Sequence, residues 1–466
     1  MVDVKQIERI YFIGIGGIGM SSLARYFKFH GKSVSGYDKT ETGLTRKLAA
    51  EGISVHYEDD PAKAPKDVQL VVYTPAVPKD HKELAYYQRH DYPVLKRSEV
   101  LGLITESSFN ICVAGTHGKT TVSTMIAHIL RDSGYGCNAF LGGIAVNYNS
   151  NFWSNERNVC VIEADEYDRS FLKLSPDIAV ITAMDADHLD IYGNAAAVEQ
   201  AFVDFSERVK PGGMLLSKYG LAKENALKAS IHETYSIQNS GAYIFSENIR
   251  IKNGSYEFNI KIGDWSLKNV RLNMGGMHNV ENIIAAIGVA KQLEIEDELI
   301  KQAVSSFKGV KRRFEYIMPA PLDGRLTGDF VFIDDYAHHP EELSALINGA
   351  KGLYPDRKCL VIFQPHLFTR TRDFVDGFAA SLDLADEVWL LPIYPARELP
   401  IEGVTSDLIL SRMKKKEKYL FNKEELLEKL KEGKSREKGK VLLITAGAGD
   451  IDTLVDPIKS ILETKR

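Results

Sequence analysis

Cysteine is scarce in this sequence, and long apolar runs are missing altogether. The four cysteines stand apart, with no CxxC pair, and a reduced protein is expected. Cys112 and Cys160 lie inside apolar runs, where a buried thiol is expected. No stretch of about 18 uninterrupted apolar residues occurs, so no membrane insertion is predicted. The first residues, MVDVKQIERI, lack the apolar core and cleavage site of a signal peptide. A cytoplasmic protein is therefore expected.

Positive charge is not in excess either. Lysine and arginine number 58 against 63 aspartates and glutamates, for a formal net charge of -5. This charge makes nucleic acid a poor partner. The 44% hydrophobic and 26% charged residues are typical of a globular protein. At about 100–200 residues per domain, 466 residues suggest about three domains.

The chain divides into three α/β segments, each opening on an apolar strand. The predicted domains are 1–107 (Rossmann-like), 108–316 (a P-loop-type ATPase domain with a parallel sheet) and 317–466 (Rossmann-like). Residues 230–275 alternate with period two and contain Asn253-Gly254, which predicts a small antiparallel addition to the central sheet. In the last segment four short strands end in polar residues, which indicates a further binding cleft at their carboxyl ends.

A first glycine loop follows the opening strand and precedes a helix. Its glycines are Gly14, Gly16, Gly17 and Gly19, and Asp38 ends the next strand. Glycines allow a tight turn, and the helix N-terminus favours a pyrophosphate, while the aspartate could bind a ribose hydroxyl. Any nucleotide with a diphosphate satisfies this pattern, whether a dinucleotide or a UDP-sugar.

A second glycine loop is more specific. It reads GTHGKTT, with two residues between its glycines where the standard P-loop has four, and it again lies between a buried strand and a helix. Successive backbone amides can cradle phosphates, a lysine can reach the terminal pair, and a threonine can hold Mg²⁺. ATP binding is therefore predicted for these residues: Gly115, Thr116, His117, Gly118, Lys119, Thr120 and Thr121.

Two acidic strand ends complete the predicted metal site. Glu163 closes one strand, and Asp185, Asp187 and His188 close the next. Magnesium usually takes a few protein ligands together with phosphate oxygens and water. The predicted Mg²⁺ ligands are Thr120, Glu163 and His188, although a lone histidine is more often a packed residue than a ligand.

Nine ordered motifs resemble those of the Mur ligase family, the ATP-dependent amide-bond ligases of peptidoglycan precursor synthesis. They cover essentially the whole chain and fall where the L-alanine-adding branch has them. The resemblance implies UDP-N-acetylmuramate and L-alanine as substrates, ATP and Mg²⁺ as cofactors, and a monomer or homodimer. The motifs are GIGGIGM, AGTHGKTT, EADEYDRSFL, DADHLD, GMHNVEN, KRRFE, DDYAHHP, FQPHLFTRTRD and AGAGDI.

The resemblance also assigns roles to single residues. The first glycine loop and Asp38 would bind the UDP-sugar. Lys119 would contact the ATP phosphates, Thr120 and Glu163 would hold one Mg²⁺, and His188 would hold a second. The residues expected to be catalytic are Lys119, His188, His338 and Arg370. Several more residues follow from the later motifs: Asn279 and Asn282 on the adenine side, Arg313 on the phosphates, Asp335 on the ribose, and Tyr336, His338 and Arg370 near the amino acid and the muramyl carboxylate. Residues 193–205 contain no lysine, so the carbamoylated lysine of several Mur ligases is not expected.

Alternative functions differ from this one in testable ways. A murein-peptide ligase would share the sugar acceptor but add a recycled peptide, and a folylpolyglutamate synthase would lack the first segment. An NAD-dependent oxidoreductase would use only residues 1–107, and a non-catalytic regulator would be expected to have lost Lys119, Glu163 or His188.

Overall fold

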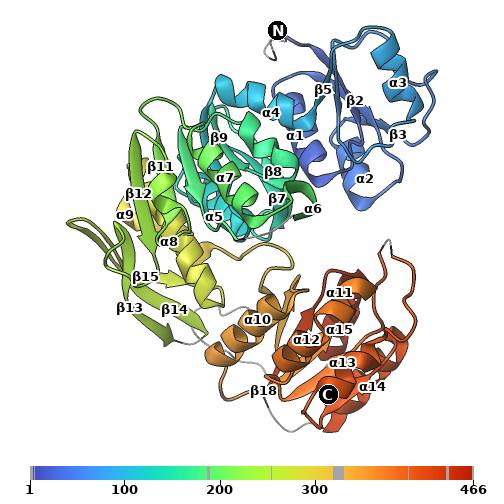
Figure 1. The fold of residues 1–466 in the computed structure, drawn as a ribbon, viewed down its shortest axis with the longest axis vertical. Coiled ribbons are helices and arrows are strands. Elements are labelled where there is room, and N and C mark those ends of the chain that lie inside the picture. Colours follow the sequence, from blue (N-terminus) through green and yellow to red (C-terminus); the bar gives the residue numbers. More distant parts are fainter. Residues whose placement is uncertain are drawn as a thin grey trace. The chain divides into compact units, whose positions relative to one another are not determined.

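Three β-sheets follow one another along the chain (Figure 1). The computed structural model describes residue 4 and residues 6–185, 189–252, 254–318, 330–396, 398–436 and 440–463. The predicted fold class is confirmed, because a parallel α/β sheet is followed along the chain by a mixed central sheet and by a mostly parallel third sheet.

The first sheet is wholly parallel, with strand order β3-β2-β1-β4-β5. The order reverses beside β1, so the carboxyl ends of β1 and β4 flank a crevice of the kind in which α/β sheets bind ligands. Its elements are β1 (Arg9–Ile13), α1 (Ile18–Phe29), β2 (Ser33–Tyr37), α2 (Gly43–Ala50), β3 (Ser54–His56), β4 (Leu70–Tyr73), α3 (Lys82–Arg89), β5 (Val94–Lys96) and α4 (Arg97–Glu106).

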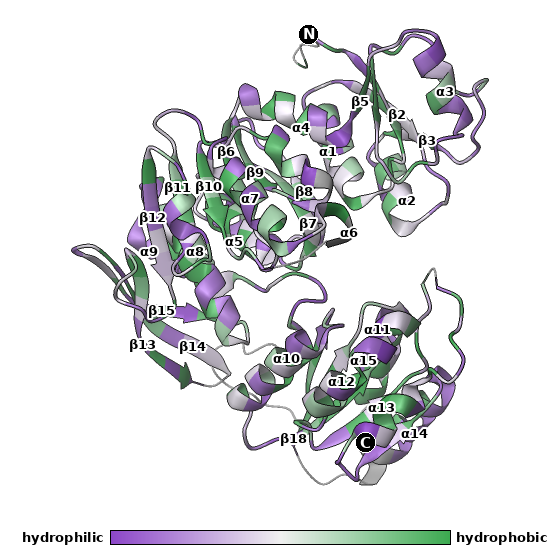
Figure 2. Cartoon of the chain, in the orientation of Figure 1, coloured by the Kyte–Doolittle hydropathy of each residue, from purple (hydrophilic) through white to green (hydrophobic). Residues whose placement is uncertain are grey.

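The second sheet has the order β15-β14-β13-β12-β11-β10-β6-β9-β7-β8. All four residues of β10 are buried, which explains its continuous apolar sequence and its green colour in Figure 2. The strands are β6 (Phe109–Ala114), β7 (Asn138–Ala145), β8 (Ser150–Trp153), β9 (Val159–Glu163), β10 (Ile178–Ile181), β11 (Met214–Lys218), β12 (Ile231–Ser236), β13 (Ile244–Lys252), β14 (Ser255–Ile262) and β15 (Trp265–Leu272). The helices are α5 (Lys119–Asp132), α6 (Leu189–Tyr192), α7 (Ala195–Ser206), α8 (Met277–Gln292) and α9 (Asp297–Ser306).

Strands β13, β14 and β15 form the edge at which an antiparallel addition is predicted. Asn253 lies outside the described residues, but β14 and β15 are joined by Gly263-Asp264 alone. A two-residue connection between neighbouring strands requires them to be antiparallel.

The third sheet has the order β16-β17-β21-β18-β19-β20, with β16 antiparallel to β17 and the other neighbours parallel. Leu426 and Leu430 of the charge-rich helix α14 are buried against it, so this helix is a solvated element with one packed face. The strands are β16 (Glu315–Met318), β17 (Phe330–Asp335), β18 (Lys358–Phe363), β19 (Glu387–Leu390), β20 (Lys418–Leu420) and β21 (Val441–Ala446). The helices are α10 (Pro340–Leu353), α11 (Phe368–Asp373), α12 (Val375–Leu382), α13 (Ser406–Arg412), α14 (Lys423–Arg436) and α15 (Val455–Glu463).

Internal contacts group the chain into two units. Unit 1 comprises Met1–Ser246, Ile260–Leu267 and Asn282–Ala303, and unit 2 comprises Glu247–Asn259, Lys268–Glu281 and Val304–Arg466. The first sheet therefore belongs to the same unit as most of the second. The predicted domain boundaries at 107/108 and 316/317 stay predictions. Across the described residues, no helix is both long and apolar enough to cross a membrane.

A cluster of polar side chains connects β1, β3 and α3 beside the first sheet. The hydroxyl of Tyr11 donates to the carboxylate of Glu83, and His56 Nε2 lies 2.7 Å from the same hydroxyl. The amide of Asp60 donates to Glu83 Oε1 at 3.1 Å. Burial raises the pKa of Glu83 to about 7.

Stability is therefore expected to depend on the protonation of Glu83. A raised carboxyl pKa means that the folded protein favours the protonated acid. The contribution of Glu83 to the free energy of unfolding is therefore fully present below about pH 4.5 and is lost as pH rises through about 7. Glu83→Gln mimics the protonated acid. We therefore expect the melting temperature of this variant, minus that of the unmodified protein, to be larger at pH 8 than at pH 5. Thermal unfolding at both pH values measures this, with the exposed Glu106→Gln as control. A constant difference in melting temperature would contradict the prediction.

Candidate active site

The second glycine loop connects β6 to α5, as the sequence predicts. A Cβ at Gly115, whose φ is +139°, would lie 2.1 Å from Thr182 Oγ1, so the loop passes β10 at a distance that only glycine allows. Thr182 Oγ1 also donates to the carbonyl oxygens of Ala114, at 3.2 Å, and His117. The loop is thus held in place before any phosphate arrives.

Lys119 reaches back over this loop. Its Nζ donates to the carbonyl oxygen of Gly115 and to Glu166 Oε1, both at 2.7 Å. The Glu166 side chain is 1% exposed, and burial raises its pKa although Lys119 acts in the opposite direction. The lysine therefore has a carboxylate partner at the place where it would meet ATP phosphates.

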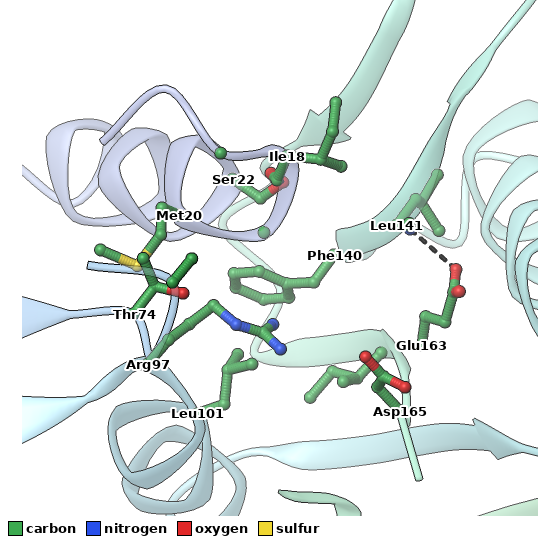
Figure 3. A pocket seen from close by; sticks show the side chains of 15 residues that line it. Ile18, Met20, Ser22, Thr74, Arg97, Leu101, Phe140, Leu141, Glu163 and Asp165 are labelled. Atoms are coloured by element: carbon green, nitrogen blue, oxygen red, sulfur yellow. Dashed lines mark hydrogen bonds between the residues drawn. The ribbon is translucent and has the colours of Figure 1, made fainter. Parts of the chain in front are cut away.

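Glu163 lies beside the loop, as predicted. The Thr120 hydroxyl donates to Glu163 Oε1 at 2.8 Å. The amide of Gly142 donates to Oε2 at 2.7 Å, and Figure 3 marks this bond. One carboxylate and one hydroxyl fit a magnesium ion that takes its other ligands from phosphate and water. Among the described residues, which do not include His188, no group of three or more His, Cys, Asp or Glu is suited to a metal.

The end of β10 is tied to the same loop. The amide of Asp185 donates to Thr116 Oγ1 at 3.1 Å, and the amide of Thr116 donates to the carbonyl of Ala183 at 3.2 Å. Asp187 and His188 lie outside the described residues, so the second predicted metal ligand stays a prediction. Asn282 on α8 lies close by, because a Cβ at Gly118 would be 3.0 Å from its Oδ1.

The first glycine loop connects β1 to α1. Asp38 Oδ2 accepts a hydrogen bond from the amide of Gly16 at 2.7 Å, and Oδ1 accepts one from Thr40 at 3.3 Å. Asp38 therefore shapes the loop itself, and its contact with a ribose stays a prediction. The loop's helix begins after Gly17, which provides no side-chain cap, so its first-turn amides are suited to an anion.

One pocket of about 400 Å³ extends from this loop to Glu163 (Figure 3). The first glycine loop forms one wall, and the middle of β7 and the end of β9 form the other. Residues from both sides, and from the ends of β4 and β5, line it: Gly17, Gly19, Thr74, Arg97, Phe140, Gly142, Glu163 and Asp165. A molecule bound at the glycine loop can therefore extend to Glu163.

Unit 2 holds the residues predicted for the amino acid. His338 Nδ1 lies 2.9 Å from the Tyr336 carbonyl oxygen, and its ring is 6.2 Å from that of His366. Burial and the charge of Arg370 lower the pKa of both histidines. Arg370 NH1 and His366 Nδ1 are buried and have no hydrogen-bond partner among the described residues. Buried polar atoms without partners in a native structure often indicate a ligand site.

Other predicted residues of unit 2 have structural partners. Asp335 accepts hydrogen bonds from the amides of Phe314 and Ala337, at 2.6 and 2.7 Å, and burial raises its pKa to about 6. The charge of Arg313 lowers that pKa, which places Arg313 near the carboxylate. Asn279 Nδ2 donates to the carbonyl of Gly275 at 2.6 Å. Their nucleotide contacts stay predictions.

Family models match most of the chain. They are the Mur ligase family catalytic domain at residues 9–108, the Mur ligase middle domain at 113–290 and the Mur ligase glutamate ligase domain at 312–449. The chain belongs to the Mur ligase family. Among its relatives, the UDP-N-acetylmuramate–L-alanine ligase of Flavobacterium psychrophilum is 47% identical and aligns over 100% of both chains.

Solved Mur ligases share the fold of this one. The structure of the UDP-N-acetylmuramate-alanine ligase MurC from Thermotoga maritima is similar with a TM-score of 0.77 and 27% identity, covering 97% of this chain and 98% of that one. A murein peptide ligase from Psychrobacter arcticus has a TM-score of 0.64 at 21% identity, covering 98% of this chain and 99% of that one. The latter similarity extends to the fold alone.

Sequence reasoning missed three residues of this Mur ligase. Glu166 contacts Lys119, Arg97 lines the pocket, and His366 packs beside His338. Each lies just after a predicted apolar strand, at the polar strand end where ligands are expected. That position was the available signal, but it does not distinguish a residue that contacts a ligand from one that caps a helix.

The pairing of Lys119 with Glu166 generates a prediction. Nucleotide phosphates have to compete with the Glu166 carboxylate for Lys119 Nζ. We expect Glu166→Gln to bind ATP more tightly, by up to about tenfold, because a neutral amide holds the ammonium less strongly than a carboxylate.

Titration calorimetry with ATP measures this change in affinity. Glu199→Gln, which removes a surface carboxylate paired with Lys223, is the control and should bind ATP normally. Unchanged or weaker binding by Glu166→Gln would mean that Glu166 supports nucleotide binding instead of competing with it.

Proposed function

We propose that this Mur ligase joins L-alanine to the lactyl carboxylate of UDP-N-acetylmuramate, with hydrolysis of ATP to ADP and phosphate. The proposal rests on the pocket of unit 1, because it connects a diphosphate-binding loop to the Thr120–Glu163 pair beside the ATP loop. An acceptor held at the first loop can thus present a carboxylate where ATP would place its γ-phosphate. The curated relatives of this branch support the same acceptor and amino acid.

The first step activates the carboxylate. A lactyl carboxylate oxygen attacks the γ-phosphorus of ATP, and the bond between this phosphorus and the β–γ bridging oxygen breaks. ADP is the leaving group, and the product is an acyl phosphate. Lys119 would neutralise charge on the phosphoryl oxygens, where most of the stabilisation is needed. Thr120 and Glu163 would hold Mg²⁺, which supplies further charge neutralisation when bound.

The second step forms the amide. The amine of L-alanine attacks the acyl carbon, phosphate leaves through a tetrahedral intermediate, and the amine loses a proton. His338 is suited to accept that proton, because its lowered pKa keeps the imidazole neutral at physiological pH. Positioning of the amino acid is the alternative role for His338, together with Tyr336 and Arg370.

Compartment and assembly complete the proposal. ATP and a nucleotide sugar are cytoplasmic substrates, which supports a cytoplasmic location. A monomer and a homodimer are both compatible with a pocket built within one chain.

Phosphate release tests the function directly. The protein is supplied with ATP, Mg²⁺ and UDP-N-acetylmuramate, and release is compared with L-alanine, with the murein tripeptide and with no amino acid. Release that depends on L-alanine is expected. Release with the tripeptide alone would favour the murein-peptide ligase, and a nicotinamide-dependent absorbance change would favour an oxidoreductase.

Loss of the Lys119 side chain should separate catalysis from acceptor binding. We expect Lys119→Ala to lower kcat by orders of magnitude, because charge on the transferred phosphoryl group is no longer neutralised. Binding of UDP-N-acetylmuramate, measured by calorimetry, should stay nearly unchanged, because Lys119 is not among the residues that line the acceptor pocket. Normal turnover by this variant would refute the assigned role of the loop.

The role of His338 can be read from the pH dependence of the rate. If its imidazole accepts the proton, kcat/KM for L-alanine falls as pH drops through a value below the ordinary pKa of about 6.5. His338→Gln should then be slower and lose this acid limb. A variant with raised KM and an unchanged pH profile would instead assign His338 to positioning.

A further inference from the structure

An arginine without a protein partner lies in the pocket between the two glycine loops. Arg97 is the first residue of α4, directly after β5 at the carboxyl edge of the first sheet. Its side chain extends into the pocket, between Met20 and Thr74 on one side and Asp165 on the other (Figure 3). Within the described residues, the side chain of Arg97 forms no hydrogen bond and no ion pair.

The position of Arg97 favours an anionic ligand. The residue occupies the first turn of a helix, where the backbone dipole favours anions and disfavours cations. The acidic residue that satisfies this helix end is Glu99, whose carboxylate accepts from the amide of Lys96 at 2.8 Å. Arg97 itself is partly buried and yet not neutralised by Glu163 or Asp165 of the same pocket.

Contact with Gly19 fixes where the guanidinium lies. A Cβ at Gly19 would be 2.9 Å from Arg97 NH1 and 3.1 Å from its Cδ, so the arginine packs directly on the backbone of the first turn of α1. A helix N-terminus that follows a glycine loop favours phosphate. A guanidinium adds a planar pair of donors that matches phosphate oxygens.

We propose that Arg97 binds the diphosphate of the UDP-sugar acceptor, together with the amides of the first glycine loop. This inference rests on the proposed function, because it takes the acceptor to be a UDP-sugar. The proposal makes Arg97 a substrate-binding residue. Gly19 would then serve both the tight turn and the close approach of the guanidinium. With a side chain at position 19, the guanidinium could not reach this place.

Calorimetric titration of the full chain tests the proposal with two ligands. UDP carries the diphosphate without a carboxylate, and UDP-N-acetylmuramate carries both. Arg97→Met, which keeps an apolar stem for packing, should weaken both ligands by a similar factor of about tenfold to a hundredfold. Arg89→Met, on the exposed end of α3, is the matched control and should stay within about twofold.

A second variant distinguishes a loss of binding from a folding defect. Gly19→Ala should weaken UDP binding by displacing the guanidinium, and it should add little further loss when combined with Arg97→Met. ATP affinity should be unchanged in all these variants, which would confirm that the second loop is intact.

Each other outcome contradicts a specific statement. Loss of affinity for UDP-N-acetylmuramate but not for UDP would assign Arg97 to the carboxylate and overturn its role at the diphosphate. Full affinity of Arg97→Met for both ligands would remove Arg97 from the site. Failure of the unmodified protein to bind either ligand would instead refute the proposed acceptor.

Discussion

The carboxylate of Glu163 is the contact on which the arrangement of unit 1 depends. One oxygen accepts from Thr120 at the start of α5, and the other accepts from the amide of Gly142 on β7. The ATP loop, β9 and the β7–β8 hairpin are thereby held together at one point. Because both oxygens accept hydrogen bonds from the protein, a metal ion would bind to a carboxylate that is already oriented.

The β7–β8 hairpin carries this constraint to the first sheet. Asn151 on β8 donates to the Ile18 carbonyl at 2.9 Å and to Ser22 Oγ at 2.6 Å, and Arg25 donates to Asn151 Oδ1 at 3.2 Å. The rings of Tyr26 and Phe140 pack with centroids 5.3 Å apart. Helix α1, whose first turn faces the acceptor pocket, is therefore anchored to the element that also orients Glu163. The two glycine loops are therefore held relative to each other by packing between their domains.

Few of the charged side chains in this site are paired with a side chain of opposite charge. Lys119 has Glu166 as its partner, whereas Arg97 has no partner among the described residues. The difference fits two kinds of phosphate binding. At the second glycine loop, Lys119 is held by an ion pair, and a nucleotide phosphate would have to displace the Glu166 carboxylate from it. At the first glycine loop, a diphosphate bound by Arg97 as proposed would not have to displace a protein carboxylate from the guanidinium.

The sequence by itself determined the three-segment α/β organisation, both glycine loops, and Thr120 and Glu163 as neighbours. These features follow from local rules, since apolar strands, glycine turns and strand-end carboxylates are encoded over short stretches. Only the tertiary structure placed Asp38 on the loop amide of Gly16 and paired Lys119 with Glu166. It alone brought Arg97 onto Gly19, 78 positions earlier in the numbering. Such contacts join residues from different strand ends, and their choice depends on strand order and packing distance, which no local pattern specifies.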